Sequence, residues 1–334
     1  MILAFTVCSN NYLAQAFVLS KSWLRYHPEA RFIIVLVDEV SGEIVYDRDE
    51  RVSILPLGKI PLENLPELIR QYNIIELNTA IKADAFIYLS SLYRPDKILY
   101  IDPDIQVYSR FDEVLDLLEN HDFVVTPHFC TPVDDEHGTS DVAMLRIGLF
   151  NLGFLAVARP DQQMPFFDWW RQRLYKYCYY NEGRALFYDQ IWINFIIVFF
   201  DKWHVLKHPG YNMANWNFHE RELSSNGEEG YLVNGLYPLR FFHFSGFKLD
   251  RPDVIAAYHT RYTFATRPDL VNIYRAYRES CMVEGAEKLS RMPCVYWEQH
   301  KQQKAKADAI AWRQLPLKAK LRRSVGKLLR KLVG

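Results

Sequence analysis

The sequence of 334 residues lacks the marks of a secreted, disulfide-bonded protein. Its five cysteines are odd in number and widely spaced, and no two of them form a C-x-x-C pair. This pattern argues against a disulfide framework and against a cysteine zinc site, and it fits a reducing cytosol. The chain starts with a strand-like segment, residues 2–7, without a basic stretch before it. We therefore expect no signal peptide.

Long hydrophobic runs are also missing. The longest, residues 191–200, contains Asn194 and lies between Asp189 and Asp201, and it is too short to span a bilayer. Internal repeats and low-complexity tracts are absent before the basic C-terminal part. With 49% hydrophobic and 15% aromatic residues, the chain can bury a large core, as one α/β domain or as one domain with an appendage.

The net charge of zero conceals an uneven distribution. Residues 301–334 carry eleven Lys or Arg against the single acid Asp308, a net charge of +10, which leaves −10 for residues 1–300. Within residues 316–334, one helical face carries Leu317, Leu321, Val325, Leu328, Leu329 and Leu332. Such a basic amphipathic segment predicts contact with an anionic membrane surface. The alternatives are a solvated charged helix or a nucleic-acid contact, and the acidic remainder of the chain disfavours nucleic acid.

Periodicity predicts an α/β fold with a mostly parallel central sheet flanked by helices. The expected strands are residues 2–7, 31–37, 52–55, 98–101, 105–108, 123–126 and 150–157. The expected helices are residues 12–26, 79–93, 111–119, 165–180 and 186–200. Residues 132–140 read as a loop and a candidate lid, and regularity fades after Asp201. Ligands of such sheets bind beyond the carboxyl ends of the strands, where Asn10, Asn11 and Asp38 are expected.

The most informative stretch is residues 97–108, in which an apolar strand delivers two acids at its end. Asp102 and Asp104 are two residues apart, so in extended backbone both side chains leave the same face, and Pro103 interrupts the hydrogen-bonding ladder between them. Two carboxylates there suit Mg²⁺ or Mn²⁺ that also holds a diphosphate. The alternative is a strand-ending turn in which Asp caps the backbone. The same spacing in residues 47–49 lies in a polar stretch and reads as a solvated turn.

Three further segments carry candidate site residues. In residues 241–248 a strand would turn His243 away from the neighbouring phenylalanines, and Lys248 would supply a point charge for phosphate. The alternative is a histidine at the edge of the core and a surface lysine. In residues 188–194 Asp189 and Gln190 open an apolar helix, where Asp is also favoured as a cap. Residues 151–153 place Asn151 and Gly153 within a strand, which indicates close approach to a ligand or a β-bulge.

These motifs, taken in order, resemble the GT-A glycosyltransferases, and specifically retaining enzymes similar to glycosyltransferase family 8. The resemblance covers roughly residues 2–250. It rests on Asn-Asn-Tyr at 10–12, Lys-Ala-Asp at 82–84, Leu-Tyr-Ile-Asp-Pro-Asp at 99–104, Asn-x-Gly-Phe at 151–154, Tyr-Asp-Gln at 188–190, Tyr-Asn at 211–212 and His-Phe-Ser-Gly-x-Lys at 243–248.

The resemblance implies a GT-A fold, a nucleotide-sugar donor, usually a UDP-sugar, and a Mn²⁺ or Mg²⁺ ion bound by Asp102, Asp104 and His243. It implies that the remaining site residues surround the donor: Asn10, Asn11 and Tyr12 near base and ribose, Lys82 near donor oxygens, Lys248 on the diphosphate, and Asn151, Asp189 and Gln190 around the sugar. Two positions depart from the family: Ser9 stands where an acid is usual, and Lys82 where arginine is more common.

The sequence is therefore interpreted as a metal-dependent retaining glycosyltransferase that transfers a sugar to a cell-surface glycan or lipid-linked acceptor. Residues 1–250 would form the catalytic domain, 251–300 a helical extension and 301–334 a basic tail on the inner face of a membrane. Residues 211–219 alternate aromatic and amide side chains, which suits acceptor sugars or a loop packed onto the core. Two rivals remain, a sugar-nucleotide pyrophosphorylase and a non-catalytic sugar-nucleotide-binding protein at a membrane.

Overall fold

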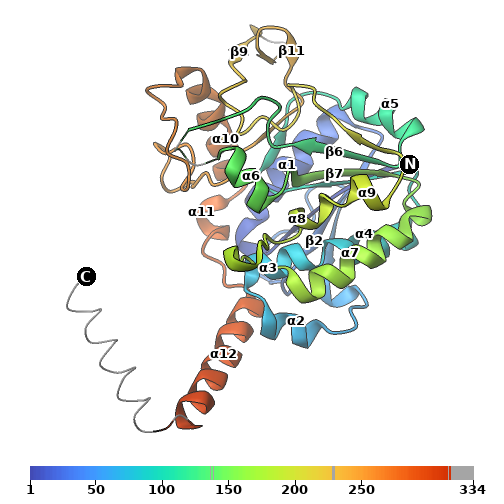
Figure 1. Ribbon diagram of the computed structural model, residues 1–334, viewed down its shortest axis with the longest axis vertical. Helices are drawn as coiled ribbons and strands as arrows, with labels where there is room; N and C mark the ends of the chain where they lie inside the picture. Colours follow the sequence, from blue (N-terminus) through green and yellow to red (C-terminus); the bar gives the residue numbers. More distant parts are fainter. Residues whose placement is uncertain (136, 138, 228–229, 315, 317–334) are drawn as a thin grey trace, which may run out of the picture.

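A seven-stranded sheet forms the centre of the protein (Figure 1). The computed structural model describes residues 1–314 and 316, except 136, 138, 228 and 229. The strand order is β3-β2-β1-β4-β7-β6-β8, and only β7 runs antiparallel to its neighbours. The strands are β1 (Ile2–Cys8), β2 (Arg31–Leu36), β3 (Val52–Pro56), β4 (Lys97–Ile101), β6 (Phe123–Pro127), β7 (Phe150–Ala158) and β8 (Trp203–Val205). The predicted α/β fold with a mostly parallel sheet is confirmed.

Helices cover both faces of this sheet, which explains why its central strands are almost continuously apolar. One face packs against α1 (Leu13–Tyr26), α5 (Asp112–Asn120) and α10 (Val271–Val283). The other packs against α2 (Leu65–Gln71), α3 (Ile74–Ala80), α4 (Lys82–Tyr93) and α7 (Met164–Tyr177). Alternate residues of β1 divide between the two layers: Ala4 joins the first core, whereas Leu3 and Phe5 join the second.

A small two-stranded sheet brings distant parts of the chain together beside the central sheet. After β4 the chain turns at Pro103, and β5 (Ile105–Val107) leaves the central sheet to pair antiparallel with β12 (Phe241–His243). His243 lies opposite Ile105 in this register. Three short strands, β9 (Leu223–Ser225), β10 (Tyr231–Val233) and β11 (Tyr237–Pro238), form a third sheet.

The region after β6 differs most from the predicted elements. The predicted helix 186–200 is wrong as one element, because the chain forms two single-turn helices, α8 (Gln190–Ile193) and α9 (Ile196–Phe199). Between them, the side chain of Asn194 accepts a hydrogen bond from the backbone N–H of Leu149 on a neighbouring segment. A further helix, α6 (Asp141–Ile147), follows the predicted loop 132–140 and was not expected.

The predicted helix 79–93 is the second half of a longer helical region. Ile81 separates α3 from α4, and Asn73 begins α3 by accepting hydrogen bonds from the backbone N–H groups of Ile75 and Glu76. The Glu76 carboxylate in turn accepts a hydrogen bond from the backbone N–H of Asn73, so the two residues form a capping box. Sequence reasoning missed this box, and with it the true start of the helical region.

Among the described residues, three α-helices follow the predicted catalytic domain: α10, α11 (Ala286–Leu289) and α12 (Val295–Gln314). The buried Asp38 carboxylate accepts a hydrogen bond from the Val295 backbone N–H at 2.8 Å, which ties the start of α12 to the end of β2. α12 then runs past residue 300, across the predicted boundary between extension and tail. Residues 317–334 of the predicted amphipathic segment lie outside the described residues. Among those described, no helix has both the length and the apolar character needed to cross a membrane.

Candidate active site

Asp102, Asp104 and His243 come together at the junction of the two sheets. His243 Nε2 lies 3.0 Å from Asp104 Oδ1 and 3.8 Å from Asp102 Oδ2. One ligand atom from each residue lies within 4.8 Å of the other two. The prediction that these three residues form one cluster is confirmed, although His243 follows the two acids by about 140 positions in the chain.

The cluster has the chemistry that a hard divalent cation requires. It offers two carboxylates and one imidazole nitrogen, a donor set that suits Mn²⁺ and, less strongly, Mg²⁺. The carboxylate side chains of Asp102 and Asp104 are 26% and 25% exposed, so they are open on one side, whereas His243 is buried. The residues present therefore fit a divalent cation that keeps further positions for ligand oxygens.

Two residues of β7 fix the ring of His243. Its Nδ1 lies 3.3 Å from the Oδ1 of Asn151, which can only accept, so Nδ1 carries hydrogen and Nε2 faces the acids. Behind the ring lies Gly153, where an added Cβ would come within 2.5 Å of His243 Cε1. The expected close approach at Gly153 is thus an approach of His243 itself.

Lys82 and Asp189 form a buried ion pair behind the cluster. Lys82 Nζ donates to Asp189 Oδ2 at 2.8 Å and to the carbonyl of Leu152 at 3.2 Å, and it lies 3.6 Å from Asp102 Oδ1. The first two contacts are hydrogen bonds, and the third, to Asp102, is an ion pair. Lys82 therefore links β7, Asp102 and the start of α8 and holds both carboxylates in place.

Charges in this cluster shift one another's pKa values. Burial alone would lower the pKa of Lys82, but Asp102 and Asp189 outweigh it and raise the pKa, so the ammonium group stays charged. Burial raises the pKa of Asp189, with Lys82 opposing. Burial would likewise raise the pKa of Asp104, but His243 and Lys248 reverse this and hold it below its ordinary value.

A cavity of about 780 Å³ opens in front of the cluster, beyond the carboxyl ends of β1 and β4. Most of the predicted site residues line it: Asn11, Tyr12, Lys82, Asp102, Asp104, Asn151, Asp189, Gln190, His243 and Lys248. Asn10 does not. It is buried beneath the cavity, where its Nδ2 donates to the Glu39 carbonyl and its Oδ1 accepts from Tyr46 Oη. The structure thus gives Asn10 a supporting position under the predicted nucleotide-binding segment.

Several lining residues escaped the sequence reasoning. His128 directly follows the carboxyl end of β6, and burial lowers its pKa to about 4, so it lines the cavity as a neutral ring. Asn78 lies one helical turn before Lys82, and its Oδ1 is buried without a partner among the described residues. Both positions carried a signal, a strand end for His128 and the spacing of four residues from Lys82 for Asn78. No pattern in the sequence indicated Tyr258, which lines the cavity and whose hydroxyl donates to Ser245 Oγ.

Residues 211–219 prove to be mainly structural. The amides of Asn212 and Asn217 are fully buried and donate to the carbonyls of Pro127 and His128, respectively. Of this segment, Trp216 alone lines the cavity, with its ring edge-on to His243 at 5.1 Å. The packed-loop alternative therefore holds for most of the segment.

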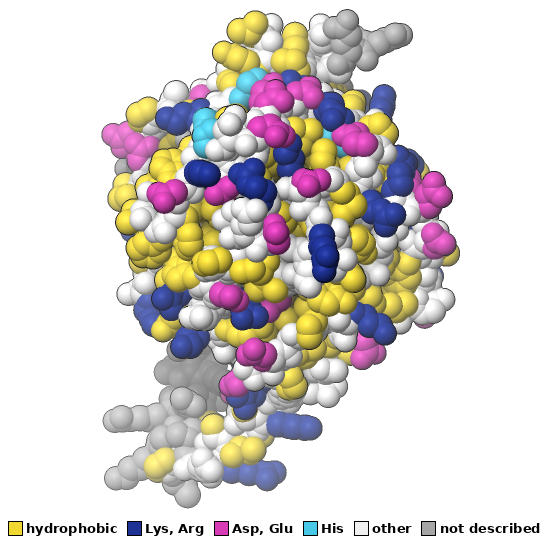
Figure 2. Space-filling view, turned by 90° about the vertical axis from the view of Figure 1, so that its right-hand side faces the viewer, with side chains coloured by type: hydrophobic (Ala, Val, Ile, Leu, Met, Phe, Trp, Pro, Cys, Tyr) yellow, Lys and Arg dark blue, Asp and Glu magenta, His cyan; other side chains and the backbone are white. Residues whose placement is uncertain are grey.

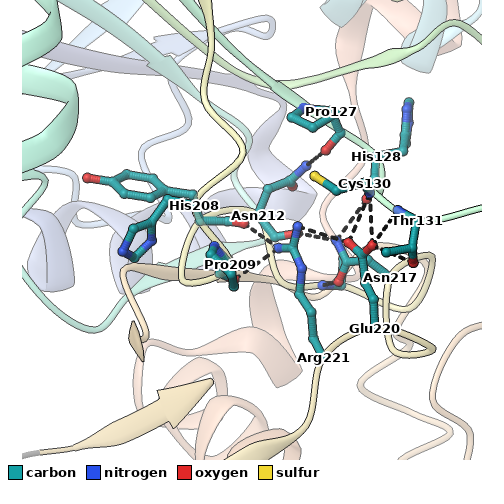
Figure 3. Close-up of polar contacts among 12 residues, drawn as sticks. Pro127, His128, Cys130, Thr131, His208, Pro209, Asn212, Asn217, Glu220 and Arg221 are labelled. Atoms are coloured by element: carbon teal, nitrogen blue, oxygen red, sulfur yellow. Dashed lines mark hydrogen bonds and ion pairs between the residues drawn. The ribbon is translucent and has the colours of Figure 1, made fainter. Parts of the chain in front are cut away.

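Figure 3 shows how the end of this segment is held. The buried guanidinium of Arg221 donates to the carbonyls of Pro209 and Tyr211. The neighbouring Glu220 carboxylate accepts from the backbone N–H groups of Cys130 and Thr131. These bonds tie residues 208–221, which include the cavity-lining Trp216, to the chain that leaves β6.

Comparison with known proteins gives distant similarities. No family model matches the sequence. The chain is 24% identical over 287 residues to the uncharacterized protein YfnF of Bacillus subtilis (strain 168), which covers 82% of this chain and 90% of that protein.

Solved structures similar to this chain include three glycosyltransferases. The galactosyltransferase LgtC, in complex with donor and acceptor sugar analogs, is 16% identical with a TM-score of 0.48, covering 90% of this chain and all of that chain. GlyE of Streptococcus pneumoniae TIGR4 is 13% identical with a TM-score of 0.48, covering 88% of this chain and 65% of that chain. Mouse xyloside xylosyltransferase 1 is 12% identical with a TM-score of 0.42, covering 73% of this chain and 97% of that chain.

Proposed function

We propose that this chain is a metal-dependent, retaining glycosyltransferase that uses a nucleotide-diphosphate sugar, with a UDP-sugar as the preferred donor. The observation that carries the proposal is the cluster of Asp102, Asp104 and His243 at the mouth of a cavity large enough for such a donor. Lys248 lines the same cavity and is exposed to it, without an ion-pair partner among the described residues. Two carboxylates, an imidazole and a free ammonium group together fit a cation and a diphosphate.

The residues of the chain divide the work of sugar transfer. A divalent cation bound by the cluster would neutralise the charge that develops on the leaving diphosphate. Lys248 adds a second positive charge at the same place without transferring a proton. Tyr100 Oη donates to Asp102 Oδ1, which orients that carboxylate toward the cavity.

Asp189 and Gln190 position the donor sugar in this proposal. Lys82 occupies one oxygen of Asp189, and this pairing weakens the carboxylate as a nucleophile. The Nε2 of Gln190 donates to the Ile147 carbonyl at 2.6 Å, which leaves its Oε1 to accept from a sugar hydroxyl. We therefore favour attack by the acceptor oxygen on the face of the leaving diphosphate over a covalent intermediate on Asp189.

Hydrolysis of nucleotide sugars tests this proposal. Purified protein is incubated with a panel of UDP-, GDP- and TDP-sugars, with and without Mn²⁺, and release of the nucleotide is measured. We expect Mn²⁺-dependent release from at least one donor, and a fall of about 10²-fold or more in Asp104→Ala, because that variant loses an oxygen ligand. Release by Asp104→Ala at the normal rate would exclude the metal role, and binding without release by the wild type would favour a non-catalytic protein.

The proposed acceptor is a cell-surface glycan or a lipid-linked saccharide, reached from the inner face of a membrane. This part rests on the sequence of residues 316–334, whose basic and leucine-rich pattern suits an anionic lipid surface. Flotation with liposomes that contain anionic lipid, using the full chain and a chain truncated after residue 315, tests it. Loss of flotation on truncation is expected, and equal flotation of both chains would end the membrane proposal.

A further inference from the structure

A second groove, of about 430 Å³, lies between α7 and the segment that forms α8 and α9. Along α7, the residues Trp169, Arg173 and Tyr177 recur every four positions and so share one face of the helix. Across the groove stand Trp192, Phe195 and Phe199. The ring centroids of Trp169 and Phe199, and those of Tyr177 and Trp192, are each 5.7 Å apart. At these distances the rings of the two sides contact one another, so the groove has a continuous aromatic lining, which we call its aromatic walls.

Two arginines in this groove have no acidic partner. The Arg173 side chain makes no ion pair or hydrogen bond with any described residue. Arg184 lies over the ring of Tyr177 at 5.4 Å and donates to Tyr179 Oη, but it forms no ion pair within the described part of the chain. The nearby acid, Glu182, is paired with Arg146 at 2.6 Å. The groove thus carries two positive charges that nothing in the described fold neutralises.

The aromatic walls are also unusually open to solvent. Phe195 is 43% exposed and Phe199 is 53% exposed. Figure 2 shows hydrophobic side chains exposed between charged ones on the side of the molecule on which α9 lies in Figure 1. Because large aromatic groups at a surface lose the free energy of burial, an open aromatic groove indicates that a ligand covers it.

The groove and the active-site cavity lie on opposite sides of one short segment. Leu186 lines the groove, and the next two residues, Phe187 and Tyr188, line the cavity. The ring of Phe187 in turn contacts that of Tyr180, which is 55% exposed, at 5.9 Å. The groove therefore begins one residue away from the cavity along the chain, and aromatic side chains lie beside the segment that separates the two.

We propose that this groove binds an acidic sugar unit of the acceptor glycan, away from the reacting centre; the acceptor role rests on the proposed function. Aromatic faces stack against the apolar faces of sugar rings, and a guanidinium group binds a carboxylate or phosphate through two parallel hydrogen bonds. Neutral sugars would use the rings but leave the two charges of Arg173 and Arg184 unpaired. The groove therefore selects for an anionic saccharide.

Direct binding tests the proposal without donor, metal or catalysis. The full-length protein is titrated calorimetrically with two acidic probes, hyaluronan tetrasaccharide and tetragalacturonate, and with the neutral chitotetraose. We expect at least one acidic probe to bind about tenfold or more tightly than chitotetraose, with affinity that falls as salt rises. The double variant Arg173→Gln, Arg184→Gln should lose that preference, and Arg275→Gln, an exposed arginine on α10, should keep it.

Metal-dependent donor hydrolysis separates this proposal from the proposed function. We expect the double variant to hydrolyse a nucleotide sugar at the wild-type rate, because neither arginine lines the cavity. If the wild type hydrolyses no donor but still prefers the acidic probe, the proposed function and the acceptor role are wrong, and the groove stands as a saccharide site.

Three results would overturn the proposal. The first is equal binding of the acidic probe by the wild type and the double variant, or binding of neither acidic probe by the wild type. The second is that the wild type binds phosphatidylglycerol vesicles but no saccharide, and that the double variant no longer binds these vesicles. The occupant of the groove would then be a lipid. The third is a dimer of the wild type, seen by analytical ultracentrifugation, that Phe199→Ser dissociates, which would make it a second copy of the chain.

Discussion

Gly153 shows how closely one position can govern the site. The His243 ring lies directly over it, so any side chain there would displace the ring from the two acids. Gly153 does not have a positive φ angle. A larger side chain is therefore excluded here by lack of space and not by the backbone conformation.

We expect Gly153→Ala to weaken Mn²⁺ binding by about tenfold or more, since the added Cβ forces a ligand out of position. Overpacking should also lower the free energy of unfolding by about 1–3 kcal/mol. Mn²⁺ titration monitored by electron paramagnetic resonance, with urea unfolding, measures both. Gly42→Ala is the matched control, because nothing lies within 4 Å of its added Cβ. Unchanged Mn²⁺ affinity in Gly153→Ala would show that His243 is not a ligand.

His27 makes stability depend on pH. Its Nε2 accepts from the Phe111 N–H, its Nδ1 faces the Trp23 carbonyl, and its ring stacks on Trp23, so the neutral form fits the core. Burial lowers the pKa of His27 from 6.5 to about 4. Between these two values the unfolded chain binds the proton and the folded chain does not, so this contribution is complete above pH 6.5 and is lost as the pH falls toward 4.

Protonation of His27 on acidification should lower the free energy of unfolding by at most about 3 kcal/mol. His27→Gln keeps an acceptor for Phe111 without a titrating ring, so its free energy of unfolding should fall less than that of the wild type between pH 7 and pH 4.5. Urea unfolding at a series of pH values measures this difference. Parallel curves for the two proteins would contradict a neutral, buried His27.

At the scale of elements, the Lys82–Asp189 pair joins the start of α4 to the residue that precedes α8. Because both side chains are 6% exposed, removing one partner leaves a buried charge uncompensated. Lys82→Met should therefore lower the free energy of unfolding by about 3–5 kcal/mol. The exposed Lys288→Met, which loses a 2.9 Å hydrogen bond to the Glu43 carbonyl and a 3.9 Å contact to the Glu43 carboxylate, should cost less than about 1 kcal/mol.

A double variant separates the structural role of this pair from its role at the site. Lys82→Met, Asp189→Leu removes both charges, so we expect it to regain most of the stability that Lys82→Met loses while donor hydrolysis stays impaired. Thermal and urea unfolding with nucleotide-release assays follow the two properties. If Lys82→Met proved as stable as the control Lys288→Met, the Lys82–Asp189 pair would not link these elements.

Arg261 anchors the predicted lid, residues 132–140. Its guanidinium donates to both oxygens of Asp135 and to the carbonyls of His137 and Thr139, and Thr139 lines the cavity. We expect Arg261→Gln to speed amide hydrogen exchange in residues 132–147 while exchange in β1 and β4 stays unchanged. Arg291→Gln, which removes an exposed contact to Glu287, is the control. Unchanged exchange in Arg261→Gln would show that other contacts hold the loop.

At the scale of the whole molecule, local patterns predicted the layers and most of the site. Buried apolar strands predict a sheet that is covered on both faces, and polar residues at the ends of these strands predict the position of the cavity. Asp102 and Asp104 could be found because two residues of one strand share a face. His243 could be placed beside them only through the resemblance to a known family, since pairing of β5 with β12 is a long-range choice.

What the sequence could not predict depends on tertiary contacts. The reversed direction of β7 was not predicted, and the chain enters β7 from α6, a short helix of which only Met144 is buried. The break between α8 and α9 follows from the bond of Asn194 to Leu149, and the buried position of Asn10 from Tyr46 and Glu39. The ion pair of Lys82 with Asp189 could not be predicted because the two residues come from distant segments, while the expected place of Lys82 at the cavity stays a prediction of its role toward the donor.

The central claim is that Asp102, Asp104 and His243 hold a divalent cation together with a nucleoside diphosphate. The most direct measurement is a calorimetric titration of UDP into the wild type and into Asp104→Asn, each with Mn²⁺ and with EDTA. The account predicts binding by the wild type that weakens by about tenfold or more in EDTA, and weak binding by Asp104→Asn in both conditions. Equal affinity for UDP with and without Mn²⁺, or an unchanged Mn²⁺ effect in Asp104→Asn, would contradict it.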